Sequence, residues 1–484
     1  MAQAIASISK EQPHYRRRQT ETPISMTNHT RLAFTAVLVG LFSACGTDDR
    51  APNNSPMTSD VDVIVSGNSV TTVTLKATDT NQDRLWFFLA SMPRHGSLGS
   101  PVEVGQGSVE VAYTPEPGYH GIDEFSFEVA DSAGDSAFGT VTIVVNNGDP
   151  GYNDRIKLAR LCNTPDGPLS GSPWPSLLFD VYDSEIVSTA RERYFAKGID
   201  HTPRLQIYDP LGDYLSYGQV VNHRESDLIA FDESGVPMIR YGTEFHYNAV
   251  TVAEYALAEY GRYLAGTKPV SGLLAGADRL LALQDERGAL LYLGSWHHYL
   301  LSEPYAPGWT SAMAQGMALS VFFRAYSVTG DRRYIEAGNA ALSYLNTPVA
   351  EGGVKDSLSS LGTGLDSYPI LEEWLGDPAI YTLNGFMFAM LGLHDWTATE
   401  GASAELARLM FDQSMKTLVA ILPYYELGGF SAYDLGHLTY DAEPHIGIGY
   451  HAWHIALLHA LGSITDDKCL AQAEKAWAAH VLAP

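Results

Sequence analysis

Residues 311–346 read SAMAQGMALSVFFRAYSVTGDRRYIEAGNAALSYLN, and this stretch decides the fold class. Apolar residues recur at helical spacing on both sides of Gly330 and Asp331, which are typical turn residues. The stretch therefore predicts two helices joined by a short turn. Six further segments after Tyr247 show the same period, and they span residues 250–266, 272–284, 382–399, 404–422, 450–465 and 469–482.

Helices that follow one another in pairs are typical of an α/α toroid, which we expect for residues 246–484. Residues 61–147 instead alternate apolar and polar side chains between turn residues. This pattern predicts a seven-stranded β-sandwich of the immunoglobulin or cadherin type. Residues 152–245 contain the short strand-like runs RLQIYD (204–209) and YGQVVNH (217–223), which indicate a β-rich hairpin region. The predicted fold class is therefore a multidomain α+β chain.

An export signal is predicted at residues 1–44, with Met26 as the natural start. Residues 32–44 read LAFTAVLVGLFSA, an apolar run that is too short to span a bilayer, and small residues end it. The end of this run together with Cys45 resembles a bacterial lipobox, which predicts lipidation of Cys45. An ordinary signal peptide with a chance cysteine is the alternative. We expect an exported, lipid-anchored protein of the bacterial cell envelope, with a linker at residues 45–60.

The charge balance argues against a nucleic-acid partner. The 484 residues contain 30 Lys and Arg against 56 Asp and Glu, a formal net charge of −26 that repels phosphate backbones. Three cysteines without metal-ligand spacing disfavour zinc and a disulfide framework. Asp79, Asp83 and Asp131 can hold calcium in the N-terminal module, or they can simply shape turns. No cofactor is otherwise expected.

Several short motifs follow one another between residues 210 and 482. The motifs are PGWTSAMAQG (307–316), EE (372–373), LNGFM (383–387), LPYY (422–425), YDL (433–435) and YHAWHI (450–455). In content and order they resemble the glucuronyl 5-epimerase family, whose members invert carbon 5 of D-glucuronate within a polymer such as heparosan and so form L-iduronate. An ordered set of this kind is far more specific than one short pattern.

The resemblance implies catalytic roles for Glu373, Tyr433 and Tyr450. Carbon 5 lies next to a carboxylate, so one base can remove its proton and an acid on the opposite face can return one. The enolate-like intermediate needs hydrogen-bond donors near the carboxylate. A glutamate in a dry pocket suits the base, and a tyrosine hydroxyl suits the acid. Each residue has a structural alternative. Glu373 can be a carboxylate at a helix start, the Tyr433 hydroxyl can pack against Asp434, and Tyr450 can be a core aromatic residue.

The resemblance also implies a set of substrate-binding positions. They are Tyr217, Asn222, Arg224, Arg240, Asn248, Thr251, Glu254, His298, Tyr299, Trp374, Asn384 and His451. Arg224 and Arg240 can hold a uronate carboxylate with paired N–H groups, although surface ion pairing in an acidic protein is the alternative. An acidic polysaccharide is the expected partner.

Four positions depart from the pattern of the animal enzymes. Trp374 and Phe388 stand in place of tyrosines, and Gly436 and Gly447 stand in place of arginines. A large β-sandwich that those enzymes insert between helical segments is also missing. These departures indicate that the substrate can differ from that of the animal enzymes. They do not argue against epimerisation at carbon 5. The animal relatives are dimers, so a homodimer is plausible here.

Other activities remain open. A polysaccharide lyase would remove the same proton and then eliminate the 4-linked sugar. A surface scaffold with an inactive enzyme domain would not need Glu373, Tyr433 and Tyr450 together. A glycoside hydrolase requires two facing carboxylates, whereas Glu372 and Glu373 are adjacent in the chain. We therefore expect a heparosan-type uronate 5-epimerase, with a lyase as the alternative.

Overall fold

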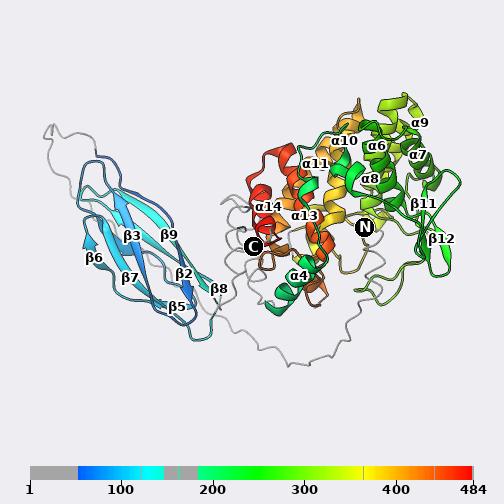
Figure 1. Cartoon of the computed structure of the whole chain (residues 1–484). Coiled ribbons are helices and arrows are strands. Elements are labelled where there is room, and N and C mark those ends of the chain that lie inside the picture. The colour runs from blue at the N-terminus through cyan, green and yellow to red at the C-terminus, as the bar shows by residue number, and fades with distance from the viewer. Residues whose placement is uncertain are drawn as a thin grey trace.

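The computed structural model contains two parts, an N-terminal β-sandwich and a C-terminal helical body, each with its own hydrophobic core (Figure 1). Cys45 and the predicted export signal lie outside the described residues. No helix in the described part of the chain is long and apolar enough to cross a membrane. The residues described are 53–119, 121–146, 158, 162, 184–362, 365–440 and 442–481.

The sandwich consists of two sheets. One has the order β1-β3-β7-β5 with β6 also paired to β7, and the other has the order β2-β9-β8-β4. Val73, Val111 and Phe127 alternate with more exposed neighbours along their strands and are completely buried between the sheets. The strands are β1 Met57–Thr58, β2 Val61–Ser66, β3 Thr71–Thr78, β4 Trp86–Leu89, β5 Gly96–Leu98, β6 Val102–Gly105, β7 Ser108–Pro115, β8 Gly121–Ala130 and β9 Ser136–Asn146.

The predicted sandwich is confirmed as a β-rich, immunoglobulin-like region, but its strand number is wrong. The described residues form nine strands instead of seven. β1, β5 and β6 have two to four residues each, and such short strands give no readable alternation. The linker prediction for residues 45–60 is also wrong at its end, because β1 pairs with β3 there.

All eight helices predicted after Tyr247 are present. Helices α6, α8, α10 and α13 pack side by side in chain order, and each also packs against the helix that follows it, namely α7, α9, α11 and α14. α8 is buried nearly all round because α6, α9 and α10 surround it. The bounds are α6 Ala249–Leu264, α7 Ser271–Leu283, α8 Ala312–Thr329, α9 Arg332–Leu345, α10 Leu383–Trp396, α11 Ala402–Ile421, α13 Ile448–Thr465 and α14 Lys468–Val481.

This row of helix pairs is the feature that positions the site. The starts of α8, α10 and α13 meet the irregular segments that precede them, and the site lies at these starts. In a closed α/α toroid, α13 would also pack against α6. Closure of the ring stays a prediction. The short helix α12 (Gly436–Thr439) and a two-stranded sheet of β13 (Lys355–Ser357) and β14 (Pro369–Leu371) complete this region.

The prediction of a β-rich region at residues 152–245 is only partly right. Residues 204–209 form no strand, and YGQV begins the helix α5 (Tyr217–Val220). Tyr217 is completely buried there, so tertiary packing overrides the local strand preference. The sequence pattern also missed the helix α4 (Ser184–Ala196). The hairpin strands lie further along, as β10 (Ile229–Phe231), β11 (Pro237–Tyr241) and β12 (Glu244–His246), which form an antiparallel sheet.

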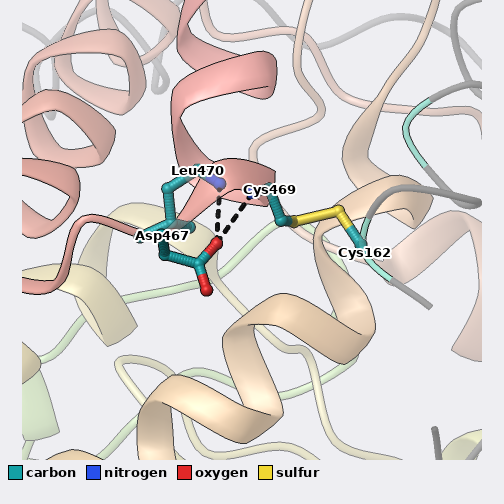
Figure 2. The surroundings of a disulfide bond; sticks show 4 residues. All are labelled: Cys162, Asp467, Cys469 and Leu470. Atoms are coloured by element: carbon teal, nitrogen blue, oxygen red, sulfur yellow. Dashed lines mark hydrogen bonds between the residues drawn. A yellow bond between two sulfur atoms is a disulfide. The ribbon is translucent and has the colours of Figure 1, made fainter. Parts of the chain in front are cut away.

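A disulfide joins Cys162 to Cys469 in the first turn of α14 (Figure 2). Asp467 accepts hydrogen bonds from the backbone N–H groups of Cys469 (2.8 Å) and Leu470 (3.1 Å), which fixes the start of this helix. The two cysteines are 307 residues apart in sequence, so no local motif could have predicted their pairing. The bond ties Cys162 to α14.

We expect the Cys162→Ser variant to lose about 2–5 kcal/mol of unfolding free energy, because the disulfide restricts the unfolded chain over a long loop. Urea denaturation of the oxidised protein and the variant, each with and without reductant, measures the difference. Reductant should destabilise the parent protein and leave the variant unchanged. Equal stability of the oxidised parent and the variant would contradict the prediction.

Candidate active site

The three predicted catalytic residues lie together, and we call them the Glu373 cluster. The rings of Tyr433 and Tyr450 are 4.4 Å apart between centroids, and interaction with the Tyr433 hydroxyl favours the ionised form of Tyr450. The charge of Glu373 acts on both tyrosines. Glu373 follows β14, Tyr433 precedes α12, and Tyr450 lies in the first turn of α13. Three separate segments therefore meet at one point.

Backbone hydrogen bonds fix these segments to the helix starts. The N–H of Ala312, the first residue of α8, donates to the carbonyl of Glu372 at 2.9 Å. The N–H of Leu383, the first residue of α10, donates to the carbonyl of Tyr433 at 3.0 Å. These two bonds use N–H groups that helix starts otherwise leave unpaired, and they position the residues next to the site.

Glu373 is a buried carboxyl group with a strongly altered acidity. Burial raises its pKa to about 8, the negative charge of Asp434 adds to the shift, and a hydrogen bond with Asn384 opposes it. Gly385 packs directly against Glu373, because a Cβ atom at Gly385 would lie 2.4 Å from the glutamate Cβ. Glu373 is thus closely packed, and its raised pKa lies near neutral pH.

The two tyrosines keep their protons at neutral pH. Burial, with the charge of Glu373 as the next cause, raises the pKa of both Tyr433 and Tyr450 far above the ordinary value. The indole N–H of Trp374 donates to the hydroxyl of Tyr433 at 2.8 Å. An indole can only donate, so the Tyr433 oxygen accepts there and its own proton must point elsewhere.

Trp374 belongs to a wall of stacked aromatic rings. Its ring lies 5.2 Å from Trp309, 6.0 Å from Tyr305 and 6.2 Å from Trp296. The side chain of Trp374 is buried and its N–H donates to Tyr433, while its predicted contact with substrate stays a prediction. The structure therefore gives Trp374 the task of orienting Tyr433.

His298 lies next to this wall, with its ring 5.3 Å from Trp374. Burial lowers its pKa to about 3, so the imidazole is neutral. Its Nδ1 accepts from the N–H of Leu300 at 3.4 Å, which leaves the proton on Nε2. Nε2 is buried without a partner among the described residues. His298 thus offers a neutral hydrogen-bond donor.

Other predicted binding residues are buried around α6 and α10. Asn384 adjoins Glu373, and its Oδ1 has no partner within the described chain. Thr251 is fully buried with an unpartnered hydroxyl. Glu254 is buried with Oε2 3.7 Å from Nε2 of His223, and its charge acts on Tyr450. These residues can contact a substrate or complete the polar interior.

Two further predictions have structural explanations. Asn248 caps α6 by accepting from the N–H of Thr251 at 2.9 Å, and its amide donates to the hydroxyl of Tyr241 at 2.8 Å. Tyr217 is completely buried with its ring 5.3 Å from Trp453. Both side chains hold the segments around α6 together.

Four predicted binding residues make no hydrogen bond, ion pair or ring contact with the side chains of the Glu373 cluster in the part of the chain that the structure describes. Asn222, Arg224 and Arg240 are exposed, and neither arginine forms an ion pair with any residue that the structure describes. His451 is completely buried, stacks on Phe430 at 4.4 Å and accepts from the N–H of Ser431 at 3.0 Å. His451 thus packs in the interior, and its contact with substrate stays a prediction.

Sequence reasoning missed a second carboxyl group. Asp434 is buried, which raises its pKa to about 6, while hydrogen bonds from the Tyr299 hydroxyl and from the Gly436 N–H (2.8 Å) oppose the shift. The Tyr299 hydroxyl also lies 3.1 Å from Nδ1 of His445. Tyr299 was predicted as a substrate contact. The signals for Asp434 were its place beside Tyr433 and within the motif YDL.

The predicted calcium ligands of the sandwich also lie close together. Oxygen atoms of Asp79, Asp83 and Asp131 all lie within 4.8 Å of one another. Asp131 Oδ1 accepts from three backbone N–H groups of the turn that follows it, of which Ala133 is the first, at 2.9 Å. An oxygen-only set fits calcium, and the same bonds also shape the turn. Calcium binding stays a prediction.

Comparison with known proteins confirms the resemblance over part of the chain. Residues 284–479 match the family described as D-glucuronyl C5-epimerase C-terminus, and residues 53–144 match the bacterial Ig domain family. The match begins at residue 284, so the resemblance of residues 210–283 stays a prediction. Together with the buried glutamate and tyrosines, these matches support an epimerase.

Two curated proteins are similar to part of this chain. The D-glucuronyl C5-epimerase of Caenorhabditis elegans is 30% identical over 182 residues, which is 35% of this chain and 28% of that protein. An uncharacterised protein of Methanocaldococcus jannaschii is 30% identical over 175 residues, or 36% of this chain and 55% of that protein. The chain thus spans only 28% and 55% of the lengths of these relatives.

Among solved structures, a family 76 glycoside hydrolase from a bovine Bacteroides thetaiotaomicron strain aligns with 86% of this chain and 99% of that chain. The identity is 10% and the TM-score is 0.35. The polysaccharide lyase BACCELL_00875 aligns with 88% of this chain and 57% of that chain, at 13% identity and a TM-score of 0.25.

Proposed function

We propose that this protein is a polysaccharide uronate 5-epimerase that converts D-glucuronate into L-iduronate in a heparosan-like polymer. The observation that carries the proposal is the Glu373 cluster, which joins a carboxyl group of near-neutral pKa to two protonated tyrosines in a buried site. Epimerisation needs a base on one face of carbon 5 and a proton donor on the other. The cluster offers both.

In the proposed reaction Glu373 takes the proton from carbon 5, and the electron pair of the broken C–H bond passes to the adjacent carboxylate. A tyrosine hydroxyl then returns a proton to the opposite face. The Nε2–H of His298 supports the charge on the intermediate, because its buried N–H has no other partner among the described residues. A lyase would instead expel the 4-linked sugar from the same intermediate.

The proposed substrate is unsulfated. Gly436 and Gly447 replace arginines of the animal pattern, and both are tightly packed, since a Cβ atom would lie 2.4 Å from Leu300 Cδ1 and 2.5 Å from Tyr450 Cδ2, respectively. The net charge of −26 opposes a densely anionic polymer. Arg224 and Arg240 are exposed and can attract uronate carboxylates of a less charged chain.

We also propose export and lipid anchoring at Cys45 in the bacterial cell envelope, with calcium binding in the sandwich and a homodimer as further proposals. The disulfide between Cys162 and Cys469 supports export, because disulfides persist mainly in oxidising compartments. The apolar run before Cys45 supports the anchor.

Proton NMR of uronate polymers incubated with the protein in heavy water tests the proposed function. We expect deuterium at carbon 5 and iduronate signals with heparosan, less with N-sulfated heparosan and least with heparin. Ultraviolet absorbance of an unsaturated uronate, with no iduronate, would favour the lyase. Absence of both exchange and elimination with every uronate polymer would reject the proposal.

The reaction should be faster at alkaline than at acidic pH. Glu373 can accept a proton only when ionised, and its pKa is raised to about 8, so kcat/KM should rise with pH, with its midpoint at about pH 8, and level off above it. The tyrosines stay protonated throughout this range. Asp434→Asn removes a charge that raises the Glu373 pKa and should shift the rise to lower pH. The same midpoint in the variant would contradict this assignment.

A further inference from the structure

A tyrosine near the Glu373 cluster has an unusual backbone conformation. Tyr381 has a φ of 59°, in the left-handed region that residues other than glycine rarely adopt. It is completely buried, and it lies two residues before Leu383, the first residue of α10. Such a conformation costs free energy, persists only where the surrounding structure holds it, and is found most often at functional sites. The contacts of Tyr381 therefore indicate what role it has.

Four hydrogen bonds hold Tyr381 in place. Its N–H donates to Oε2 of Glu372 at 3.2 Å, and its carbonyl accepts from the hydroxyl of Tyr425 at 2.7 Å. Its own hydroxyl donates to the carbonyl of Ser357 at 2.8 Å and accepts from the N–H of Ser360 at 3.2 Å. The partners lie at the end of β14, after α11, and at the end of β13. Both the backbone and the ring of Tyr381 are thus fixed from separate parts of the fold.

The first turn of α10 connects Tyr381 to the proposed base. The N–H of Leu383 donates to the carbonyl of Tyr433 at 3.0 Å. Gly385 packs on the carboxyl group of Glu373, because a Cβ atom at Gly385 would lie 2.4 Å from Oε2 as well as from the glutamate Cβ. Three residues separate Tyr381 from Gly385 in the chain. A change in φ at Tyr381 would therefore rotate this turn and move Gly385 relative to Glu373.

The other described residues with a positive φ, glycines aside, lie elsewhere. Asp466 ends α13 in a left-handed cap, which is a common way for a helix to end. Gln82 lies between β3 and β4, and Leu215 and Ser216 precede α5. Tyr381 alone lies in the segment between β14 and α10, which also carries the proposed base.

We propose that Tyr381 is a positioning residue for the base of the reaction. Its left-handed backbone sets the first turn of α10 so that Gly385 packs against the carboxyl group of Glu373 and restricts its orientation. The inference rests on the proposed epimerisation, in which a base contributes fully only when it is correctly placed. Tyr381 itself transfers no proton. Glu372→Gln keeps an acceptor for the Tyr381 N–H, so that variant leaves the arrangement in place.

Tyr425→Phe tests the proposal, because it removes the hydroxyl that holds the Tyr381 carbonyl and leaves the Glu373 cluster itself unchanged. The rate of inversion should fall by about tenfold or more, since a displacement of about 1 Å at a reacting group can cost roughly 10²-fold. The loss should lie in kcat, with KM nearly constant, because Glu373 acts in the transition state. Deuterium incorporation over a series of heparosan concentrations in heavy water measures both constants. Tyr381→Phe, which releases the ring from Ser357 and Ser360, should also lower kcat.

Tyr260→Phe is the matched control. Tyr260 is a buried tyrosine whose hydroxyl donates to the carbonyl of Leu211 at 2.8 Å, and it lies toward the end of α6, whereas the site lies at helix starts. Tyr260→Phe and Tyr425→Phe each lose one hydrogen bond of the same kind, so both should lose thermal stability, but only Tyr425→Phe should lose kcat. A normal kcat in Tyr425→Phe, or an equal fall in both variants, would overturn the positioning role alone. A wild-type protein that labels no uronate polymer would overturn the proposed function and the positioning role together.

Discussion

Glu373→Gln should lower the rate of carbon 5 inversion by at least ~10²-fold while the protein stays folded, because a positioned base typically contributes 10²–10⁴-fold. The amide has nearly the same shape as the carboxyl group and cannot accept the proton. Deuterium exchange into glucuronate on the Glu373 face should disappear with the inversion. NMR of heparosan in heavy water measures both rates, and thermal denaturation checks the fold.

The neighbouring carboxyl group provides a strict control for this variant. Burial raises the pKa of Glu372 well above its ordinary value, and its Oε2 accepts from the backbone N–H of Tyr381. Glu372→Gln keeps the shape of this side chain and leaves Glu373 in place, and we expect less than a tenfold loss. Equal losses in the two variants, or near-normal inversion by Glu373→Gln, would refute the assignment of the base.

The helical body could be predicted from the sequence because its elements are long and periodic. α8 spans 18 residues and α11 spans 20, which is enough to display the helical period several times. The strand predicted at YGQV (217–220) was wrong for the opposite reason. It is short, and the burial of Tyr217, rather than its own preference, determines its helical form.

The site could be predicted as far as its residues lie within recognisable motifs. Glu373, Tyr433 and Tyr450 each belong to one of the ordered motifs, and the structure brings them together. The contacts of Asp434 and Tyr299 could not be found in this way. Tyr299 lies 135 residues from Asp434 and 146 from His445, and only the folded chain makes them neighbours.

The disulfide and the role of Trp374 were missed for a similar reason. Cys162 and Cys469 pair across 307 residues, and the sequence offers no spacing rule for such a distance. Trp374 was interpreted as a lost tyrosine at a substrate position. Its indole nitrogen instead serves a partner 59 residues away, which a substitution pattern alone does not reveal.

Tyr450→Phe should also lower inversion by at least ~10²-fold, but with a different isotope result. The indole of Trp374 donates to the Tyr433 oxygen, and the hydrogen bond from Tyr433 favours the ionised form of Tyr450. This order makes Tyr450 the residue that gives up its proton and Tyr433 the one that stabilises the resulting anion. Glu373 is untouched in Tyr450→Phe, so deuterium should still enter glucuronate while iduronate fails to form.

Tyr433→Phe separates the two tyrosine roles. It removes one hydrogen bond to a charged oxygen, an interaction of about 1.5–3 kcal/mol, and so should slow inversion by roughly 10- to 100-fold, less than Tyr450→Phe does. Trp374→Phe acts one step further away and should cost less again, since it leaves both hydroxyls in place. Rates of inversion for the three variants, measured with heparosan in heavy water, test this order. The variant that lacks the proton donor should show the larger loss of inversion rate, because no other group then supplies the proton. A larger loss in Tyr433→Phe than in Tyr450→Phe would therefore reverse the assignment and make Tyr433 the proton donor.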